Sequence, residues 1–417
     1  MRVEVINTGT ELLLGHVINT HLKFFAEELF PLGLRIERQV TVPDGLAIRD
    51  ALLETSGRAE IVLVTGGLGP TTDDVTRDVV AELLGLELVH DEEIMRAIEV
   101  RFARRGLTMG ARNRLQAQRP REAVVLMNPN GTAPGLYFPP LDKGGMGHSP
   151  HIFLLPGPPR ELQPMFTDQV LPILEKALPP RPVVAMSMYR VAGMGESGVE
   201  DLVGEPLLAL GLEVGYCARP GEVDVRLIGA PAVLEQARGI VIGKLGAHIV
   251  SEDSRALEKV IVDLLTARGE TLAIAESCTG GFVAHRVTNV PGASAVFTQG
   301  FVTYANDAKT RALGVDAALI REHGAVSSEV AGAMASGACA AAGADYALAT
   351  TGIAGPGGGS EAKPVGTVFI ALATPGEPPV VERHRFQNER ETFKNLVAQT
   401  ALNLLRRRLV ERGPMTR

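Results

Sequence analysis

The chain has 417 residues, 45% of them hydrophobic and 21% charged, so it has enough residues for roughly two to four globular domains and is too apolar for global disorder. Asp and Glu outnumber Lys and Arg by 48 to 41, and the net charge of −7 argues against a general nucleic-acid binder. Three widely spaced cysteines, Cys217, Cys278 and Cys339, offer neither a disulfide framework nor a CxxC metal site, and no apolar run reaches membrane-spanning length. We therefore expect a soluble, cytoplasmic protein that binds neither nucleic acid nor membrane.

Residues 1–170 alternate short apolar runs with amphipathic helical patterns. Strands that alternate with helices build right-handed βαβ units around a parallel sheet, so this segment predicts an α/β domain. The expected strands are 3–6, 34–40, 61–64 and 152–155, and the expected helices are 20–29, 46–53, 75–84 and 160–177.

The pattern changes in residues 171–252, which predict a small α+β connecting domain. Two alternating segments, 212–217 and 223–228, flank a turn at 219–222 and indicate a β-hairpin. No catalytic cluster is visible here, and we expect a spacer or a dimerisation element. The other expected elements are a strand at 183–191 and helices at 198–208 and 234–245.

Residues 253–417 predict a second α/β domain. A small-residue helix at 330–342 precedes a buried strand at 346–350, and a long helix at 393–408 closes the chain. The other expected elements are strands at 271–275, 296–304, 368–373 and 380–386 and helices at 257–268 and 280–287.

The stretch Thr65-Gly-Gly-Leu-Gly-Pro-Thr-Thr-Asp-Asp-Val-Thr76 joins an expected strand to an expected helix. Its three glycines let the backbone approach a ligand, and the helix N-terminus favours an anion, which together suit a phosphate. Asp73 and Asp74 then supply hard oxygen ligands for Mg²⁺ or Mn²⁺, although an Asp in this position also serves as a helix N-cap. The stretch is neither a Walker A loop nor a GxGxxG motif.

This stretch resembles the motif of MoaB/MogA-like domains, and more closely that of the N-terminal domain of the CinA family. Gly9-Thr-Glu-Leu-Leu-Leu-Gly15, Asn130-Gly-Thr-Ala-Pro-Gly135 and Leu155-Pro-Gly-Pro-Pro-Arg-Glu161 match the same family in order. The resemblance implies an α/β sandwich that hydrolyses the pyrophosphate of ADP-ribose with a divalent metal of the Mg, Mn or Co type. It assigns phosphate to Gly66, Gly67 and Gly69, the nucleotide pocket to Asn130, Gly131 and Gly135, and the metal to Asp73, Asp74, Asp44 and Glu11.

A second constellation begins at Ala275-Glu-Ser-Cys-Thr-Gly-Gly281, where a strand turns into a helix and presents Ser277. Serine is a weak nucleophile and needs a base, and Lys309, in the turn after the next strand, is a better partner than the sequence-local His285. Lys309 acts as a base only when neutral, which requires burial or a neighbouring cation to lower its pKa. A Ser–Lys dyad is a known chemical solution.

A third element, Thr350-Thr-Gly-Ile-Ala-Gly-Pro-Gly-Gly-Gly359, follows the buried strand at 346–350. Its backbone can cradle a 5′-phosphate and leave amides for an oxyanion, and a plain surface loop is the alternative.

These elements, with Lys363-Pro-Val-Gly-Thr-Val368 downstream, resemble the C-terminal domain of CinA, a PncC-type amidohydrolase of nicotinamide mononucleotide. The resemblance implies a nucleophilic Ser277, a basic Lys309, an orienting Tyr304 and no cofactor for this reaction. Arg390 aligns with a substrate-contacting Arg of the family's Gly-Asp-Arg motif, which here reads Asn388-Glu-Arg390. The substrate-binding residues implied are Thr279, Gly280, Asn306, Thr351, Gly352, Gly355, Gly357 and Arg390.

The sequence therefore predicts a homodimeric, bifunctional enzyme of pyridine-nucleotide salvage whose partners are nicotinamide mononucleotide and ADP-ribose. One alternative is a protein that binds and adenylylates molybdopterin through its first domain. Another is a non-catalytic partner in DNA competence, which the acidic charge balance disfavours as a direct DNA binder.

Overall fold

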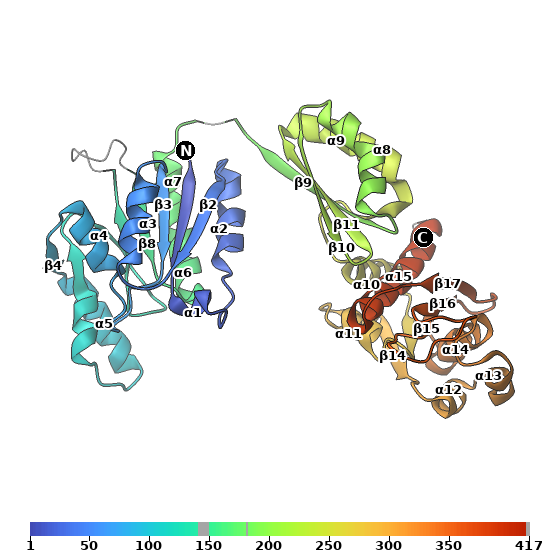
Figure 1. Cartoon of the computed structure of the whole chain (residues 1–417). Coiled ribbons are helices and arrows are strands. Elements are labelled where there is room, and N and C mark those ends of the chain that lie inside the picture. Colours follow the sequence, from blue (N-terminus) through green and yellow to red (C-terminus); the bar gives the residue numbers. More distant parts are fainter. Residues whose placement is uncertain (141–149, 181, 414–417) are drawn as a thin grey trace. The chain divides into compact units, whose positions relative to one another are not determined.

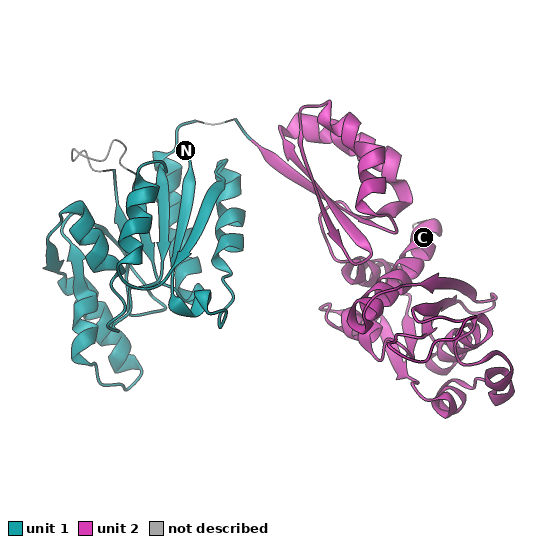
Figure 2. Cartoon of the chain, viewed as in Figure 1, with its two compact units in different colours: residues 1–183 teal, residues 184–417 magenta. Residues whose placement is uncertain are grey.

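The computed structural model describes residues 1–140, 150–180 and 182–413 (Figure 1). The chain forms two compact units, residues 1–183 and 184–417 (Figure 2). Each unit has its own sheets and cores, and the carboxyl ends of parallel strands position the candidate sites in both.

The first unit is built on a six-stranded sheet in the order β2-β1-β3-β8-β7-β6. The strands β2, β1, β3 and β8 run parallel, whereas β7 and β6 pair antiparallel at one edge. The predicted parallel sheet is confirmed, and β6 and β7 add an antiparallel edge that the sequence patterns did not indicate. The strands are β1 (Val3–Thr8), β2 (Ile36–Val42), β3 (Ile61–Thr65), β6 (Val124–Leu126), β7 (Gly135–Phe138) and β8 (His151–Leu155).

Helices cover both faces of this sheet, and alternate residues of β1 show why. Val3 and Val5 pack in the core shared with α2, α6 and α7, whereas Ile6 packs in the core shared with α3 and α4. The helices are α1 (Thr10–Leu13), α2 (His21–Leu29), α3 (Ala47–Ser56), α4 (Thr76–Leu84), α5 (Glu92–Arg104), α6 (Pro159–Met165) and α7 (Leu171–Ala177), and a small ribbon pairs β4 (Leu88–His90) with β5 (Gln118–Pro120).

The helix expected at 160–177 consists of α6, a π-helical turn at Phe166–Val170 and α7. Pro172 lacks the N–H that a regular α-helix would use at this point, which accounts for the change in hydrogen bonding. Leu174 is buried in the core of the first unit, so α7 belongs to that unit and not to the connecting domain predicted to begin at residue 171.

The second unit begins with an antiparallel sheet in the order β10-β11-β9-β12, covered by α8 and α9. The expected hairpin is present as β10 and β11, which pair from Glu213 opposite Ile228 to Arg219 opposite Glu222. The elements are β9 (Ala185–Ala192), α8 (Glu196–Leu208), β10 (Glu213–Arg219), β11 (Glu222–Gly229), α9 (Pro231–Leu245) and β12 (Ile249–Ser251).

The rest of the second unit is built on a five-stranded sheet in the order β14-β13-β15-β16-β17. The strands β14, β13 and β15 run parallel, and β16 and β17 continue antiparallel. Its elements are α10 (Leu257–Arg268), β13 (Leu272–Glu276), α11 (Phe282–Thr288), β14 (Phe297–Val302), α12 (Asn306–Leu313), α13 (Ala317–His323), α14 (Ser328–Ala342), β15 (Tyr346–Gly352), β16 (Thr367–Ala373), β17 (Val380–Arg385) and α15 (Arg390–Glu411).

Small residues let α14 pack tightly against its neighbours. A Cβ added at Gly337 would lie 1.9 Å from the carbonyl oxygen of Leu313, the last residue of α12. Close packing of α14 on α12 therefore holds the segment that carries Lys309.

The connecting sheet and the five-stranded sheet meet along α15. The Gln399 amide donates to Glu222 Oε1 at 2.7 Å, and the buried Arg406 guanidinium donates to the carbonyl oxygens of Ala247 and Ile249 at 2.6 and 2.9 Å. These bonds explain why the connecting sheet belongs to the second compact unit.

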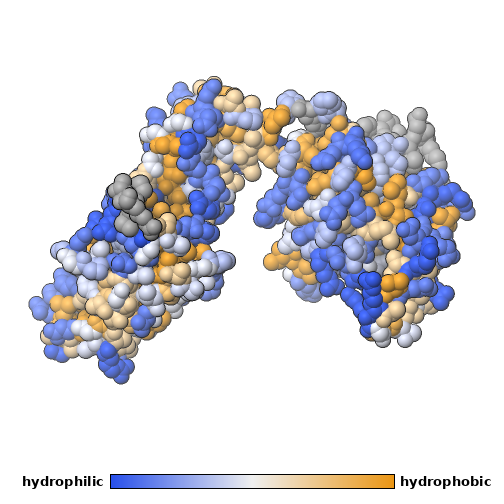
Figure 3. All heavy atoms as spheres, turned by 180° about the vertical axis from the view of Figure 1, so that it is seen from behind, coloured by the Kyte–Doolittle hydropathy of each residue, from blue (hydrophilic) through white to orange (hydrophobic). Residues whose placement is uncertain are grey.

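Hydrophobic and hydrophilic residues are interspersed over the face of both units drawn in Figure 3. Among the described residues, no helix combines the length and the apolar character that a membrane span requires.

Candidate active sites

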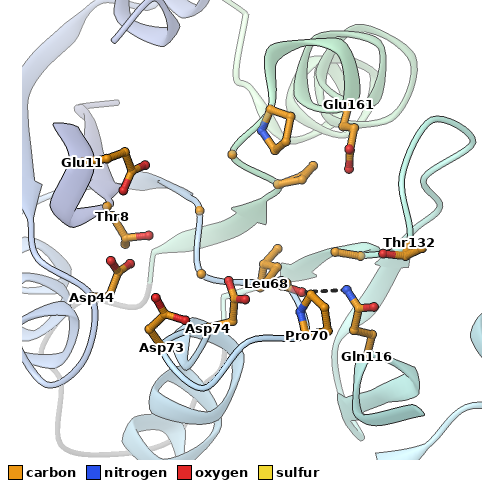
Figure 4. Close-up of a pocket in the computed structure, with 18 residues that line it drawn as sticks. Thr8, Glu11, Asp44, Leu68, Pro70, Asp73, Asp74, Gln116, Thr132 and Glu161 are labelled. Atoms are coloured by element: carbon orange, nitrogen blue, oxygen red, sulfur yellow. Dashed lines mark hydrogen bonds between the residues drawn. The ribbon is translucent and has the colours of Figure 1, made fainter. Parts of the chain in front are cut away.

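The first candidate site is a cavity of about 360 Å³ in the N-terminal unit, drawn in Figure 4. It opens where β1, β3 and β8 end, so Gly9, Gly66 and Pro156 lie side by side at its wall. Carboxyl ends of parallel strands meet at one edge of a sheet, which is where ligands of open α/β sheets bind.

The loop after β3 needs glycine at three positions for lack of space. Gly66 and Gly67 have positive φ angles of 96° and 67°. A Cβ at Gly66 would lie 2.5 Å from the Thr8 hydroxyl, and one at Gly69 would lie 2.4 Å from the Asp74 carboxylate. The loop backbone is therefore packed against its support, and the three glycines that the family resemblance assigns to phosphate line the cavity.

All four acidic residues assigned to a metal, Glu11, Asp44, Asp73 and Asp74, line this cavity. Figure 4 shows these carboxylates on one side of the cavity, with Glu161 and Thr132 on the other. Asp44 Oδ2 accepts from the N–H and hydroxyl of Thr10, and Asp74 Oδ2 accepts from the N–H of Thr71 at 2.8 Å and from its hydroxyl. The pKa of Asp73 lies below its ordinary value because polar groups around its carboxylate, the Thr71 side chain first and its own backbone N–H next, favour the charged form.

The donor chemistry suits a hard divalent cation that phosphate oxygens help to hold. Within residues 1–140, 150–180 and 182–413, no three His, Cys, Asp or Glu side chains form a ready-made metal centre. Mg²⁺ commonly binds through one or two carboxylates together with substrate phosphates, and the cavity offers such carboxylates beside a glycine loop.

Asn130, Gly131 and Gly135, assigned to the nucleotide pocket, lie beside the cavity rather than in its wall. The Asn130 amide donates to the Arg160 carbonyl at 3.2 Å, and a Cβ at Gly131 would lie 1.7 Å from Glu161 Oε2. A Cβ at Gly135 would meet the Met165 sulfur at 2.4 Å, so this glycine permits packing of β7 on α6.

Thr8, Gln116 and Glu161 line the cavity without having been assigned a role from the sequence. Glu161 ends the Pro-Gly-Pro-Pro-Arg-Glu segment that follows β8, and its place after this strand is the sequence feature that indicates a position at the cavity. Gln116 donates to the carbonyl oxygen of Leu68 at 3.3 Å and thereby braces the glycine loop.

The second candidate site lies at the carboxyl ends of β13, β14 and β15. Glu276, the last residue of β13, is opposite Val302 of β14 and Thr350 of β15. Ser277 follows immediately and is anchored by its backbone N–H, which donates to the Thr350 carbonyl at 2.9 Å. The three predicted motifs therefore meet at one edge of the sheet, because each follows one of three adjacent parallel strands.

Lys309 reaches Ser277 from α12, and its Nζ lies 3.2 Å from Ser277 Oγ. Nζ also contacts the carbonyl oxygens of Thr303 and Tyr304 at 2.8 and 3.4 Å. The lysine is 1% exposed, and in the described part of the chain it has no carboxylate partner. Burial lowers the pKa of Lys309, since desolvation disfavours the charged amine.

Two other nearby groups are poorly placed for the same chemistry. Burial raises the pKa of the Cys278 thiol to about 12, so this neighbour of Ser277 stays protonated. The exposed His285 ring stacks on Phe282 and lies 3.1 Å from the Asn289 amide.

Tyr304 presents its two polar groups to different partners. Its backbone carbonyl contacts Lys309, whereas its exposed side-chain hydroxyl accepts from Arg390 Nη2 at 2.6 Å. Arg390 Nη1 also donates to the Gly355 carbonyl at 3.0 Å. Arg390, at the start of α15, therefore ties the Tyr304 side chain to the glycine loop, and the Tyr304 hydroxyl points to that arginine rather than to the dyad.

The hydroxyls assigned to substrate are engaged within the protein. Thr351 Oγ1 donates to the Ala325 carbonyl at 2.7 Å, and Thr279 Oγ1 lies 2.7 Å from Thr350 Oγ1. Both side chains are buried, so they support the site and do not project into it.

The remaining assigned residues differ in the space around them. Asn306 is exposed at the start of α12. A Cβ at Gly352 or Gly355 would clash with Thr367 or Val365, whereas Gly280 and Gly357 have open space around them.

Comparison with known proteins gives matches over both units. Residues 254–409 match the family model described as the CinA C-terminal domain, and residues 4–176 match the model described as the probable molybdopterin binding domain. A CinA-like protein of Akkermansia muciniphila is 46% identical over 403 residues, which cover 96% of this chain and 96% of that protein. A CinA-like protein of Citrifermentans bemidjiense is 42% identical over 421 residues, covering 99% of this chain and 98% of that protein.

A solved structure, that of the competence/damage inducible protein CihA from Agrobacterium tumefaciens, is 42% identical to the part of this chain that it matches. The match covers 36% of this chain and 91% of the other, with a TM-score of 0.35.

Proposed function

Because the chain belongs to the CinA family, with a MoaB/MogA-like N-terminal domain, we propose that it is a bifunctional hydrolase of pyridine nucleotides. Its C-terminal domain hydrolyses the amide of nicotinamide mononucleotide, and its N-terminal domain hydrolyses the pyrophosphate of ADP-ribose. The observation that carries the first activity is the buried Lys309 amine, 3.2 Å from Ser277 Oγ and surrounded by neutral acceptors.

The acylation half of the amide hydrolysis uses two proton transfers through one amine, and the deacylation half uses two more. Ser277 Oγ attacks the carboxamide carbon while neutral Lys309 takes the hydroxyl proton, and Lys309 then protonates the departing ammonia. Water, deprotonated by the same amine, hydrolyses the acyl-enzyme and releases nicotinate mononucleotide with regeneration of the serine. This assignment fits a lysine whose pKa is lowered by burial, because only the neutral amine accepts the first proton.

Few backbone N–H groups near Ser277 remain available to bind an oxyanion, because most of them already donate to acceptors within the protein. The backbone N–H groups from Gly280 to Ala284 all donate within the protein. The N–H groups of Cys278 and Thr279 are therefore the turn's candidates for stabilising the tetrahedral intermediate.

In the N-terminal domain, the glycine loop would hold the pyrophosphate while Asp73 and Asp74 lie at a divalent cation. Such a cation, when bound, neutralises phosphate charge and polarises the scissile phosphorus centre. The support is the cavity itself, where these carboxylates lie beside Gly66, Gly67 and Gly69.

Purified full-length protein tests both assignments. Incubation with nicotinamide mononucleotide is expected to release ammonia and nicotinate mononucleotide, measured by a coupled assay and chromatography. No ammonia above a no-enzyme blank would refute the amidase.

A chelator is expected to separate the two activities. EDTA should abolish hydrolysis of ADP-ribose to AMP and ribose 5-phosphate, because the carboxylates of the N-terminal cavity do not neutralise phosphate without a cation. The same EDTA should leave ammonia release unchanged, since the Ser277–Lys309 chemistry uses no metal. Phosphate-ester products are measured by chromatography, and restored activity after Mg²⁺ addition is the control. ADP-ribose hydrolysis that persists in EDTA would contradict the metal assignment.

Asp74→Asn is expected to reduce ADP-ribose hydrolysis by roughly 10–100-fold and to raise the Mg²⁺ concentration needed for half-maximal rate. The substitution removes a negative ligand but keeps an oxygen that can accept from Thr71. Asp78→Asn is the matched control, because Asp78 lies on α4, pairs with Arg77 and is not among the residues lining the cavity. Equal rates for wild type and Asp74→Asn at limiting Mg²⁺ would remove Asp74 from the site.

Molybdopterin is the competing ligand for the first domain, because the matching family model is described by it. Side-by-side assays with ADP-ribose and molybdopterin decide between hydrolysis and cofactor binding. Salt-sensitive DNA binding by the purified chain would instead favour the competence-associated reading that the name of the solved relative suggests.

A further inference from the structure

Glu276 is a buried carboxylate that the proposed reaction does not use. It directly precedes Ser277, is 1% exposed and accepts three backbone N–H groups at the start of α11. Oε2 accepts from Gly281 at 2.9 Å and Val283 at 3.1 Å, and Oε1 accepts from Ala284 at 2.8 Å. These bonds close the turn from residue 276 to residue 281 into a ring.

The first N–H groups of a helix have no acceptor within the helix, and at the start of α11 these groups donate to acceptors elsewhere in the turn. Three such N–H groups bind one internal carboxylate, and the N–H of Phe282 donates to Thr279. A carboxylate buried without partners would be costly, so three donors explain how Glu276 is tolerated in the core. The α11 N-terminus is consequently closed to a substrate anion.

The backbone carbonyl of Glu276 also helps to hold the segment that positions Lys309, the proposed base. The carbonyl oxygen of Glu276 accepts from the Thr303 N–H at 2.8 Å, and the Thr303 carbonyl accepts from Lys309 Nζ at 2.8 Å. Nζ in turn lies 3.2 Å from Ser277 Oγ. A chain of hydrogen bonds therefore connects the Glu276 carbonyl, through Thr303 and Lys309, to Ser277.

Resting on the proposed amidase function, we propose that Glu276 is the positioning residue of the Ser277–Lys309 pair. Its carboxylate holds the nucleophile's turn against α11, and its carbonyl holds the segment that supports the base. Small displacements of reacting groups cost about 10²-fold in rate, so a loosened turn should affect catalysis before it affects substrate binding.

Glu276→Gln tests this role, because the amide keeps one acceptor oxygen but places an NH₂ group against N–H donors. The expected result is a kcat for ammonia release about 10²-fold lower, with KM for nicotinamide mononucleotide changed by less than about threefold. KM is spared because the glycine loop at 350–359 makes no bond to the Glu276 side chain. A kcat within about threefold of wild type would overturn the proposal.

Asp345→Asn is the matched control for lost backbone anchoring. The Asp345 carboxylate accepts from the N–H and hydroxyl of Thr271, both at 2.8 Å, at the opposite end of the same sheet. This variant should keep its kcat even if it lowers the melting temperature. An equal kcat loss in both variants would mean that general destabilisation explains the effect and would overturn the proposal.

A titration of the Lys309 amine by NMR gives a readout that needs no substrate. Burial is the main cause of the lowered pKa of Lys309, and the Glu276 charge is not among its causes. Loosening the pair admits water and raises this pKa toward its ordinary value. Charged and titratable groups on the elements around Lys309 are Glu276, Cys278, Tyr304, Asp307, Arg311, Arg321, Glu322, His323 and Glu329, and of these the Cys278 thiol acts electrostatically on the amine.

We expect the pKa of Lys309 to rise in Glu276→Gln, and an unchanged or lower pKa would overturn the proposal. If the wild type releases no ammonia, the proposed function fails while this titration still decides the role of Glu276. Glu276→Asp, which keeps the charge but shortens the reach, should show a smaller kcat loss. Loss of folding in both Glu276 variants would assign the residue to stability alone and would also overturn the proposal.

Discussion

Ser277→Ala is expected to abolish ammonia release from nicotinamide mononucleotide, with a loss of at least about 10³-fold in kcat. The alanine removes the hydroxyl that we propose forms the acyl-enzyme, and the neighbouring Cys278 thiol, buried and protonated, does not replace it. The fold should persist, because the backbone N–H of residue 277 keeps its bond to the Thr350 carbonyl. Ammonia release is measured by a coupled assay and folding by circular dichroism.

Two controls accompany the Ser277 prediction. Ser336→Ala changes an exposed serine on α14 and should leave ammonia release unchanged. ADP-ribose hydrolysis by Ser277→Ala should equal that of wild type, because the site assigned to it lies in the other unit. Ammonia release at the wild-type rate from a folded Ser277→Ala protein would rule out the serine as nucleophile.

Lys309→Met is expected to reduce ammonia release by roughly 10²–10⁴-fold, because methionine has no group that takes the Ser277 proton. Methionine has a similar length and is apolar, so it suits the buried position. In wild type, the rate should fall as pH drops through the lowered pKa of Lys309, since protonation removes the base. Lys259→Met, on α10 and paired with Asp263 in solvent, is the matched control for the loss of a lysine.

The same substitution should change how stability depends on pH. Burial depresses the folded-state pKa of Lys309, so between that pKa and about 10.4 the unfolded chain holds a proton that the folded chain lacks. Wild-type stability therefore gains from rising pH across this window, whereas Lys309→Met has no such gain.

The free energy of unfolding of Lys309→Met relative to wild type should fall as pH rises through that window, by about 1.4 kcal/mol for each pKa unit of depression. Denaturant melts at several pH values measure this difference. A constant difference across the window would mean that the amine is charged in the folded protein, and the base assignment would fail.

Local patterns predicted most of the helices and strands that frame the sites. Apolar runs separated by helical periods indicated the parallel strands β1, β3 and β8 and the later strands β13 and β15. The antiparallel edge formed by β6 and β7 escaped detection, because three- and four-residue strands leave too few residues for a periodic signal.

The pairing of Ser277 with Lys309 was predicted from motifs, and the structure places the two groups 3.2 Å apart. They are 32 residues apart in sequence, and they meet because β13 and β14 are parallel neighbours with Glu276 opposite Val302. By contrast, the hydroxyls of Thr351 and Thr279, which the resemblance assigns to substrate, contact partners within the protein. These contacts depend on which strand or loop lies next to each residue, and the local sequence does not specify that neighbour.

The sequence by itself determined which reactive groups this protein carries and where they lie along the chain, because residue type and spacing depend on the chain alone. These groups are the glycine loops after strands, the paired aspartates, and a serine and a lysine at turns. Only the tertiary structure decided that the Glu276 carboxylate accepts backbone N–H groups at the start of α11, that Glu161 lines the N-terminal cavity, and that the Tyr304 hydroxyl accepts from Arg390. Each of these outcomes depends on which donors and acceptors strand pairing and helix packing bring within about 3 Å, and such distances are set between segments remote in sequence.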